Sequence, residues 1–310
     1  MENGCQTWIN KSKILTLTVF TPTFNRARTL QRLYESLVSQ TCMDFEWMII
    51  DDGSTDNTGE LVKGFIRERK ISIRYIHKEN GGLYTGYNTA YENIDTELCV
   101  CLDSDDFMPA NAVELIVEKW RKNGSDEYCG IVGLDFYAGT QTPIAGYFPD
   151  GMRECYYLDL YIKNIHRGDS KYVMRTQLMK EVAPMEGFPG EKDFNPGYMF
   201  LKVCDDRPLL VLNENLCFVD YRSGDNMSAA IWMQYRRSPK SFAKMRELEM
   251  GLKRSTLLNR YRSGIHYVAD SLLARNYSFL RETKHKLPVT VSILPGCLLY
   301  FLILFKTQAR

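Results

Sequence analysis

The sequence predicts an α/β fold with a doubly wound, mainly parallel sheet and helices on both of its faces. Apolar segments of strand length alternate with amphipathic helical segments between residues 14 and 103, which is the pattern of a parallel sheet with helical crossovers. A polar cluster follows each of three strand segments, at the edge where open α/β sheets bind ligands. The 310 residues, 45% hydrophobic and 25% charged, suffice for one large globular domain plus an appendage.

The individual elements follow from side-chain periodicity and from the points where apolar runs end. A first helix is expected over residues 29–40 because Leu30, Leu33 and Leu37 lie on one helical face. The expected strands are residues 14–20, 45–50, 71–77, 98–103, 130–137, the start of 171–182, and one or two strands within 209–221. The other expected helices are residues 57–70, a segment ending near residue 93, residues 111–122, and the end of 171–182.

Charge divides the chain into two predicted domains, residues 1–225 and 226–310. The first carries 24 Lys and Arg against 34 Asp and Glu, whereas the second carries 15 against 4. The second is helix-prone and includes the apolar segment 287–305, which is short for a membrane-spanning helix. A basic segment beside an apolar one is typical of docking on an anionic membrane surface. The alternative is a C-terminal helix packed on the body of the protein. Nucleic acid is a disfavoured partner because most of the chain is acidic.

Cysteine usage and the start of the chain indicate a compartment. The nine cysteines include no Cys-x-x-Cys pair, and residues 1–13 carry no apolar signal core. A reducing setting is therefore expected. Together with the basic and apolar C-terminal region, this predicts a cytoplasmic protein that is peripheral on the inner face of the cell membrane.

Three polar clusters are expected to converge at one edge of the sheet. Asn25, Asp52 and Asp103 each lie just past the carboxyl end of an expected strand. Asp105 and Asp106 add two carboxylates to the last cluster, and Mg²⁺ or Mn²⁺ often bridges such carboxylates to substrate phosphates. The alternative is an acidic turn in which Asp106 caps a helix that begins at Pro109.

Four motifs occur in order along this part of the chain, namely Thr21-Pro-Thr-Phe-Asn-Arg26, Asp51-Asp-Gly-Ser-Thr-Asp56, Asn80-Gly-Gly82 and Asp103-Ser-Asp-Asp106. Together they resemble the family 2 glycosyltransferases with the GT-A fold, in particular bacterial cell-surface polysaccharide members. The resemblance covers roughly residues 14–225 and makes that domain the nucleotide-sugar-binding catalytic domain. It implies transfer of a hexosyl or N-acetylhexosaminyl group, with inversion, from a nucleotide-diphosphate donor such as a UDP-sugar. The acceptor would be a saccharide or a lipid-linked molecule, in surface polysaccharide or glycolipid synthesis.

The resemblance also implies roles for individual residues. Asp105 would ligate Mn²⁺ or Mg²⁺, and Asp103 would contact the ribose or complete the metal shell. Asp52 would accept a hydrogen bond from uracil. Gly82 would allow close backbone approach to the donor or form a turn, while Asp169 would position donor or acceptor. The residues expected to line the nucleotide pocket are Pro22, Thr23, Asn25 and Arg26, and the candidate diphosphate partners are Lys171, Arg175 and Arg222.

An inverting transfer needs a general base for the acceptor hydroxyl. The family usually places an acidic residue on a downstream loop, which corresponds here to Gly190-Glu-Lys-Asp193. We expect Glu191 to be the base, with Asp193 as the second candidate. The alternative is that both carboxylates stabilise a helix N-terminus.

Two other functions remain open from the sequence. A nucleotidyltransferase also uses acidic metal sites, but the expected early glycine-rich loop is missing because no glycine occurs between Phe20 and Gln31. A non-catalytic membrane-surface binding protein with a degenerate transferase fold would explain Lys192 and Leu83, which stand where an acidic and a basic residue are often found.

Overall fold

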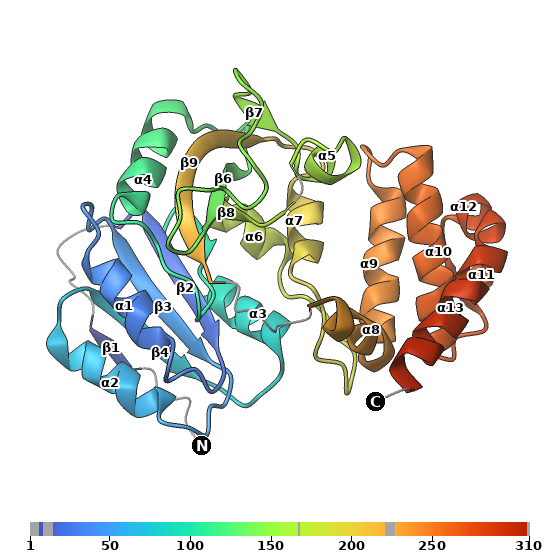
Figure 1. The fold of residues 1–310 in the computed structure, drawn as a ribbon, viewed down its shortest axis with the longest axis horizontal. Coiled ribbons are helices and arrows are strands. Elements are labelled where there is room, and N and C mark those ends of the chain that lie inside the picture. The colour runs from blue at the N-terminus through green and yellow to red at the C-terminus, as the bar shows by residue number, and fades with distance from the viewer. Residues whose placement is uncertain (1–5, 9–14, 167, 221–226, 309–310) are drawn as a thin grey trace. The chain divides into compact units, whose positions relative to one another are not determined.

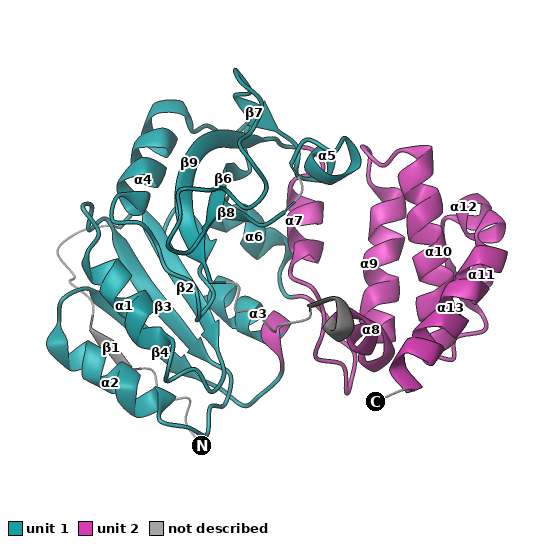
Figure 2. Ribbon diagram, viewed as in Figure 1, with its two compact units in different colours: residues 1–81, 85–184, 207–222 teal, residues 82–84, 185–206, 223–310 magenta. Residues whose placement is uncertain are grey.

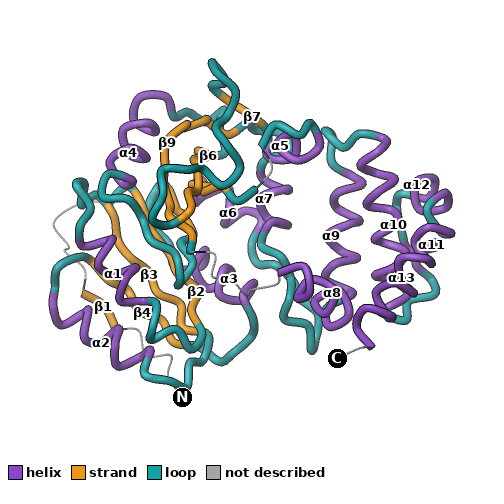
Figure 3. The backbone as a smooth tube through the Cα atoms, in the orientation of Figure 1, coloured by secondary structure: helices purple, strands orange, loops and turns teal. Residues whose placement is uncertain are grey.

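The computed structural model describes residues 6–8, 15–166, 168–220 and 227–308 of the chain (Figure 1). Within these residues, nine strands form one sheet in the order β1-β4-β3-β2-β5-β8-β6-β9-β7. Helices alternate with the strands along the first part of the chain, and only helices follow the last strand (Figure 3). The α/β class and the helical C-terminal region are therefore confirmed.

One half of the sheet has the parallel arrangement that the sequence predicted. It contains β2 (Leu17–Thr23), β3 (Phe45–Asp51), β4 (Ser72–His77) and β5 (Leu98–Cys101). All three pairings within this half are parallel. The carboxyl ends of the four strands therefore meet at the same edge of the sheet, where the polar clusters follow.

Alternating side chains of these strands pack into cores on both faces of the sheet. On one face, Trp47 belongs to a buried cluster with residues of three helices, α1 (Leu30–Val38), α2 (Thr58–Glu68) and α4 (Ala112–Asn123). On the other face, Phe20 packs edge-on against Tyr87 and Tyr91 of α3 (Leu83–Asn93), with ring centroids 5.1 and 5.5 Å apart. The predicted doubly wound layering follows from these two contacts.

The other half of the sheet is mixed. It contains β6 (Gly130–Tyr137), β7 (Glu154–Cys155), β8 (Ser170–Arg175) and β9 (Leu209–Val219), with α5 (Tyr157–Ile162) and α6 (Thr176–Val182) between them. β8 runs antiparallel to both β5 and β6. The first residues of β8 therefore lie at the edge where β5 and β6 end.

At the opposite side of the sheet, β1 (Gln6–Trp8) pairs antiparallel with β4. The sequence predicted no element there.

The chain forms two compact units (Figure 2). The sheet unit comprises residues 1–81, 85–184 and 207–222, and the helical unit comprises residues 82–84, 185–206 and 223–310. The predicted domain boundary between residues 225 and 226 lies outside the described residues, as does the candidate diphosphate partner Arg222. The segment 185–206 belongs to the helical unit, which a boundary drawn from net charge did not anticipate.

The helical unit is organised around α10 (Leu257–Leu273), which packs against α9 (Pro239–Gly251) and α13 (Ile293–Gln308). Tyr267 and Val268 of α10 join Met250 and Val289 in a buried core. The other helices of the unit are α7 (Gly197–Val203), α8 (Met227–Arg237), α11 (Phe279–Glu282) and α12 (Lys286–Val291). Among the described helices, none combines the length and the apolar character needed to cross a bilayer.

Candidate active site

The loops that follow β2 and β3 are held together by Asn25. Its backbone adopts a positive φ of 55°, a conformation that asparagine tolerates better than most residues. The Asn25 side-chain oxygen accepts hydrogen bonds from the backbone N–H groups of Thr55 and Asp56, at 2.8 and 3.2 Å. The Asn25 N–H in turn donates to Ser54 Oγ at 2.8 Å. The first two predicted clusters therefore meet, and Asn25 joins the loops that carry them.

Asp52 lies at the carboxyl end of β3 and is largely buried. Lys78 Nζ donates to its Oδ1 at 2.6 Å, the Gly81 N–H donates to the same oxygen at 2.9 Å, and Asn80 donates to Oδ2 at 3.2 Å. Lys78 follows β4 and was not singled out from the sequence. The Asp52 carboxylate thus joins the ends of β3 and β4 into one wall.

The Asp103–Asp106 turn follows β5, and two arginines from the first loop and α1 hold it. Arg26 Nη2 lies 3.9 Å from Asp105 Oδ2. Arg32 donates to the carbonyl oxygen of Asp105 at 2.6 Å and to the carboxylate of Asp220 at 2.8 Å. The structure therefore brings Arg26 and Asp105 together, and Arg32 holds the turn through the Asp105 carbonyl oxygen.

The alternative prediction, that Asp106 caps the next helix, is wrong. α4 begins at Ala112 with Asn111 as its N-cap residue. Asp106 instead donates its backbone N–H to the Asp103 carbonyl at 3.0 Å and turns its side chain toward Lys171. Asp106 therefore closes the turn and takes part in a buried ion-pair network.

That network centres on Lys171, at the start of β8. Its ammonium lies 3.9 Å from Asp106 and 3.7 Å from Asp135, and all three side chains are at most 9% exposed. Burial by itself would lower the pKa of Lys171, but the carboxylates of Asp135 and Asp106 hold it well above its usual value. Lys171 is therefore a fixed positive charge beneath the turn.

The acids around Lys171 outnumber it. Burial raises the pKa of Asp106 to about 7 and that of Asp135 to about 6, against the attraction of Lys171. Desolvation by the surrounding protein atoms also raises the pKa of Asp103, and the neighbouring carboxylates of Asp105 and Asp169 raise it further. The carboxyl groups of Asp103, Asp106 and Asp135 thus all interact with the one ammonium of Lys171.

Asp103 and Asp105 fit a divalent cation that is completed by a substrate. In the described part of the chain, no three His, Cys, Asp or Glu side chains are grouped closely enough to hold a metal by themselves. Mg²⁺ is usually held by one or two carboxylates, waters and substrate phosphates rather than by a protein cage. Desolvation is the largest cause of the raised pKa of Asp103, and Asp105 on the same turn adds to it against the attraction of Lys171. A cation between Asp103 and Asp105 would oppose both effects.

Arg175 requires a correction, because it does not lie at this edge. Since β8 runs antiparallel to β5, Arg175 pairs with Leu98 at the beginning of β5. Its guanidinium contacts the carboxylate of Asp126 and the carbonyl of Tyr128. The sequence placed Arg175 with Lys171 because the direction of β8 was not predicted.

Pro22 and Thr23 occupy the last positions of β2, where Thr23 lies beside Asp51. The Thr23 hydroxyl is buried and has no hydrogen-bond partner among the described residues. Both residues therefore lie at the edge of the sheet where the parallel strands end, and the Thr23 hydroxyl is enclosed there.

Gly82 and the two base candidates belong to the helical unit. Gly82 has a φ of +93°, and a Cβ built on it would lie 2.6 Å from the Lys192 carbonyl oxygen. Its glycine character is explained by this close approach to the protein's own backbone, within the loop that carries the two carboxylates.

The two carboxylates of that loop differ in how many of their oxygen atoms have a hydrogen-bond or ion-pair partner. Glu191 is 8% exposed, and its oxygens accept from the N–H groups of Lys240 and Ser241 and from the Ser241 hydroxyl, at 2.7 to 3.0 Å. It therefore stabilises the N-terminus of α9. Asp193 receives a hydrogen bond from Ser238 and an ion pair from Arg237 on Oδ2 alone, and its side chain is 23% exposed.

Sequence reasoning missed Lys78, Arg32 and Asp135. Lys78 immediately follows an expected strand, so the rule that singled out Asn25, Asp52 and Asp103 also applies to it. Arg32 lies in the middle of an amphipathic helix, and Asp135 lies in an apolar strand, so neither follows the end of a strand. Their partners, Asp220 and Lys171, are distant in sequence, and no local pattern points to them.

Comparison with known proteins assigns the chain to a family. The family model described as "Glycosyl transferase family 2" matches residues 18–178, which is 161 of the 310 residues. Glycosyltransferase GlyA of Streptococcus pneumoniae serotype 4 is 30% identical over 54% of this chain, and chondroitin synthase of Pasteurella multocida is 33% identical over 36%. The matched segments are only 23% and 11% of those proteins. Glycosyltransferase GlyG of S. pneumoniae is 24% identical, over 71% of this chain and 76% of its own length.

Solved structures agree in fold. S. aureus TarS 1–349 in complex with UDP-GlcNAc has a TM-score of 0.57 and 17% identity, over 92% of this chain and 90% of that one. Mannosyltransferase PcManGT from Pyrobaculum calidifontis, in complex with GDP-Man and Mn²⁺, has a TM-score of 0.54 and 13% identity, over 94% and 88%. The motifs, the sheet and the family match agree: the chain belongs to glycosyl transferase family 2 and has the GT-A fold.

Proposed function

We propose that this protein is a metal-dependent, inverting glycosyltransferase that uses a nucleotide-sugar donor, most simply a UDP-sugar. The observation that carries the proposal is the meeting of Arg26, Asp105 and Lys171 around one edge of the sheet. Cationic and acidic groups placed together in this way suit a diphosphate and a divalent ion in the same site. The named ligands of TarS and PcManGT, UDP-GlcNAc and GDP-Man with Mn²⁺, support this choice.

Different residues at the sheet edge would bind different parts of the donor. Arg26 would contact the diphosphate, and Asp169 would face the sugar. Thr23, Asn25 and Asp52 would face the nucleoside. A bound Mn²⁺ or Mg²⁺, held by Asp105 and Asp103, would stabilise the charge that develops on the leaving diphosphate. Lys171 would hold the turn in place through Asp106.

We propose Asp193 rather than Glu191 as the general base, which reverses the preference drawn from the sequence. Glu191 is committed to the first turn of α9, whereas Asp193 keeps Oδ1 without a partner among the described residues. The acceptor oxygen would bond to the anomeric carbon as the bond from that carbon to the diphosphate oxygen breaks. Asp193 would take the hydroxyl proton, and the nucleoside diphosphate would leave with the electron pair.

The test compares Asp105→Asn with Asp150→Asn, a matched change at an exposed turn of the same unit. Turnover of a panel of nucleotide sugars with Mn²⁺ is measured, with UDP binding followed by calorimetry. We expect Asp105→Asn to lower turnover at least about 100-fold, because electrostatic stabilisation of this kind is worth several kcal/mol. Unchanged turnover would refute the metal site. Donor binding without turnover in the wild-type protein would support a non-catalytic binding protein instead.

We also propose that the helical unit docks on an anionic membrane surface. α12 and α13 expose one apolar stripe at successive helical turns, whose members are Leu287, Val291, Leu294, Leu298, Phe301 and Phe305, each at least 56% exposed. Arg281, Lys284 and Lys286 precede the stripe. A short apolar face beside cationic residues suits the interface rather than the interior of a bilayer. This would make the protein peripheral on the cytoplasmic side, acting in surface polysaccharide or glycolipid synthesis.

Substitution tests docking better than truncation, because the other face of α13 packs on α10. A Cβ on Gly296 would lie 2.5 Å from Val268, so removal of the helix would expose the core. We expect Leu298→Gln with Phe301→Gln to weaken sedimentation with phosphatidylglycerol vesicles at least tenfold. The control, Met43→Gln with Tyr137→Gln, changes two exposed apolar residues of the sheet unit. Equal binding by both double variants would refute the docking face.

A further inference from the structure

The loop that carries Asp193 exchanges hydrogen bonds with the start of α9. A serine at the N-cap position of a helix normally accepts from an N–H group of the first turn. Ser238 holds that position in α9, but its hydroxyl makes no hydrogen bond to its own helix. Glu191 accepts from the Lys240 and Ser241 N–H groups instead, at 3.0 and 2.8 Å. The Ser238 hydroxyl is therefore released from capping.

The released hydroxyl binds Asp193 twice. The Asp193 N–H donates to Ser238 Oγ at 3.1 Å, and Ser238 Oγ donates to Asp193 Oδ2 at 3.2 Å. One hydroxyl thus joins the backbone and the side chain of the same residue, which restricts rotation of the Asp193 carboxylate about its Cα–Cβ bond. Because Ser238 is 0% exposed, the two hydrogen bonds are shielded from water.

Arg237 approaches the same carboxylate oxygen. Its Nε lies 3.3 Å from Asp193 Oδ2, and its side chain is 60% exposed. An ion pair of such an exposed arginine is weak. Asp193 Oδ1, the atom that would take the acceptor proton, has no partner among the described residues. The two contacts on Oδ2 therefore leave the other oxygen atom for proton transfer.

Ser238 is itself held by the two helices that meet at it. Its N–H donates to the Gln234 carbonyl of α8 at 2.9 Å, and its carbonyl accepts from the Phe242 N–H of α9 at 3.2 Å. The rings of Tyr235 and Phe242 pack against each other across this junction, with centroids 4.6 Å apart. The backbone of two helices therefore sets the position of the Ser238 hydroxyl.

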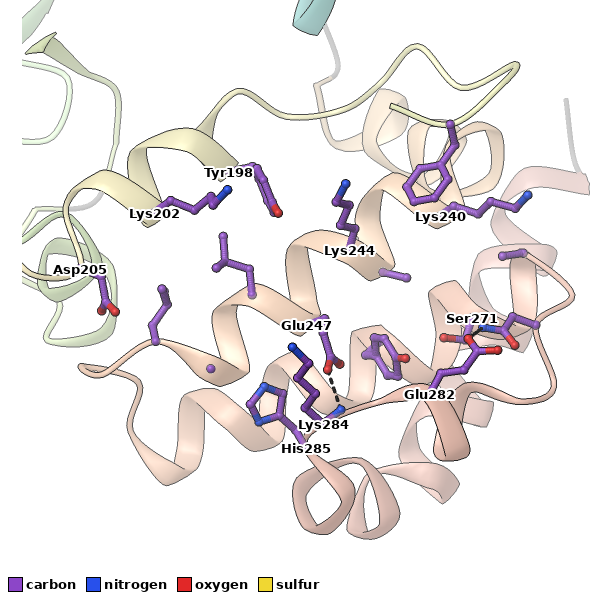
Figure 4. Close-up of a pocket in the computed structure, with 18 residues that line it drawn as sticks. Tyr198, Lys202, Asp205, Lys240, Lys244, Glu247, Ser271, Glu282, Lys284 and His285 are labelled. Atoms are coloured by element: carbon purple, nitrogen blue, oxygen red, sulfur yellow. Dashed lines mark hydrogen bonds between the residues drawn. The ribbon is translucent and has the colours of Figure 1, made fainter. Parts of the chain in front are cut away.

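The backbone that follows Asp193 is held without Ser238. The next residue, Phe194, is 2% exposed, and the centroid of its ring lies 5.0 Å from that of Tyr198. The Lys244 ammonium lies 6.0 Å from both ring centroids. Lys244 comes from α9 and Tyr198 from α7, and both line the cavity that Figure 4 shows. Removal of the Ser238 hydroxyl should therefore leave the loop in place and release only the Asp193 side chain.

We propose that Ser238 is a positioning residue that orients the Asp193 carboxylate toward the acceptor hydroxyl. This rests on the proposed function, because Ser238 acts through the general base of that reaction. Asp193 Oδ1 takes the hydroxyl proton, the acceptor oxygen bonds to the anomeric carbon, and the nucleoside diphosphate leaves with the electron pair. The role of Ser238 is to limit the orientations of the base before this step.

The test is a double-mutant cycle of Ser238→Ala and Asp193→Asn. Release of the nucleoside diphosphate is measured on the panel of nucleotide sugars with Mn²⁺ and with water as the acceptor, which gives kcat and KM for each variant. Ser263→Ala is the matched control, because the buried Ser263 hydroxyl also donates to a carboxylate of the helical unit, Glu249 Oε2, at 2.7 Å. Thermal unfolding verifies that each variant is folded.

We expect Ser238→Ala to lower kcat at least about tenfold at an unchanged KM for the donor, because a small displacement of a reacting group can cost about 100-fold. Ser263→Ala should lower the melting temperature to a similar extent and keep the wild-type kcat. In the Asp193→Asn background, Ser238→Ala should lower kcat no further, since residues that act as a unit are not additive. A merely structural role would instead give equal losses in both backgrounds.

The outcomes separate this inference from the function on which it rests. If Asp193→Asn loses turnover and Ser238→Ala keeps it, the positioning role of Ser238 is refuted and the base stands. The same holds if Ser238→Ala costs as much in the Asp193→Asn background as in the wild-type protein. If Asp193→Asn keeps wild-type turnover, or if the wild-type protein turns over no donor of the panel, the proposed function fails and this inference fails with it.

Discussion

The sheet unit and the helical unit both bury carboxylates, but the partners of these carboxylates differ. At the sheet edge, Asp106 and Asp135 lie 3.9 and 3.7 Å from the buried ammonium of Lys171, and Asp105 lies 3.9 Å from Arg26. In the helical unit, Glu191 accepts from the N–H groups of Lys240 and Ser241 at the start of α9. The first arrangement suits a cation with a phosphate ligand, whereas the second stabilises a helix end.

This difference teaches that counting charged residues is less informative than finding their partners. The whole chain carries 39 Lys and Arg against 38 Asp and Glu, which by itself predicts no ligand. Hydrogen bonds decide which of these charges remain available. Glu191 and Asp193 show the same distinction within one loop, since the first is saturated by α9 and the second is not.

The largest expected effect comes from Asp193→Asn. General bases contribute about 10²–10⁴-fold, so transfer to an acceptor should fall within that range while UDP affinity stays at the wild-type value. Steady-state transfer kinetics and UDP calorimetry measure the two. Glu191→Gln serves as the comparison, because it should lower the melting temperature more than the rate. If Glu191→Gln abolishes transfer without loss of stability, the assignment of the base is reversed.

Lys171→Met tests the buried network at the sheet edge. Removing one partner of a buried ion pair leaves uncompensated charge and typically costs about 3–5 kcal/mol. We expect a loss of that order in the free energy of unfolding, measured by urea denaturation. Lys180→Met, at a partly exposed pair with Asp95, should cost less than about 1 kcal/mol. Equal losses in the two variants would show that Lys171 is not a buried counter-charge.

A pH effect is expected in the helical unit, where Asp270 is fully buried on α10. Burial raises the pKa of Asp270 to about 8, against the attraction of Arg246. The folded state therefore holds a proton that the unfolded state has lost, so stability is greatest at low pH and falls as the pH rises toward 8. The loss between pH 6.5 and 8 is about 2 kcal/mol.

Asp270→Asn should remove most of this slope, which urea denaturation at the two pH values measures. Asp106, whose pKa burial raises to about 7, contributes the part below about pH 7. His266 is the neighbouring titratable group, and burial lowers its pKa to about 4. Its contribution to stability is lost only as the pH falls from about 6.5 toward 4, below the window used. A wild-type protein whose stability is constant from pH 6.5 to 8 would contradict the assignment to Asp270.

Arg32→Lys should have the smallest effect. A lysine cannot reproduce the paired hydrogen bonds of Arg32 to Asp105 and Asp220, so the turn that carries Asp105 should loosen. We expect about a tenfold loss in kcat/KM for the donor, since a hydrogen bond to a charged group contributes about 1.5–3 kcal/mol. Arg121→Lys, at a separate pair with Asp44, should leave kcat/KM unchanged. A similar loss in both variants would indicate a general effect of arginine removal.

The parallel half of the sheet was predictable because its signals are local. Each strand is a short apolar run that ends in a polar cluster, and right-handed connections bring those ends to one edge. Strand β3 was expected at residues 45–50 and is found at Phe45–Asp51. The contact of Asn25 with the loop after β3 agrees with the predicted convergence of the polar clusters at one edge, whereas the pairing of Arg26 with Asp105 also needs β2 to lie beside β5, an order that the sequence did not predict.

The mixed half and the helical unit were less predictable because their arrangement depends on long-range pairing. The direction of β8 decides that Lys171 lies at the site edge and Arg175 at the other, and a six-residue strand carries no local sign of its direction. Likewise, nothing in Gly190-Glu-Lys-Asp193 reveals that the α9 N-terminus binds Glu191, because α9 begins almost fifty residues later.

The most direct test of the account is the titration of UDP with Mn²⁺ into Asp105→Asn and into the matched variant Asp150→Asn. The account predicts that Asp105→Asn loses at least about tenfold in UDP affinity when Mn²⁺ is present, and that Asp150→Asn keeps the wild-type value. Equal UDP affinities in the two folded variants would contradict the assignment of a metal–diphosphate site to the Asp103–Asp106 turn.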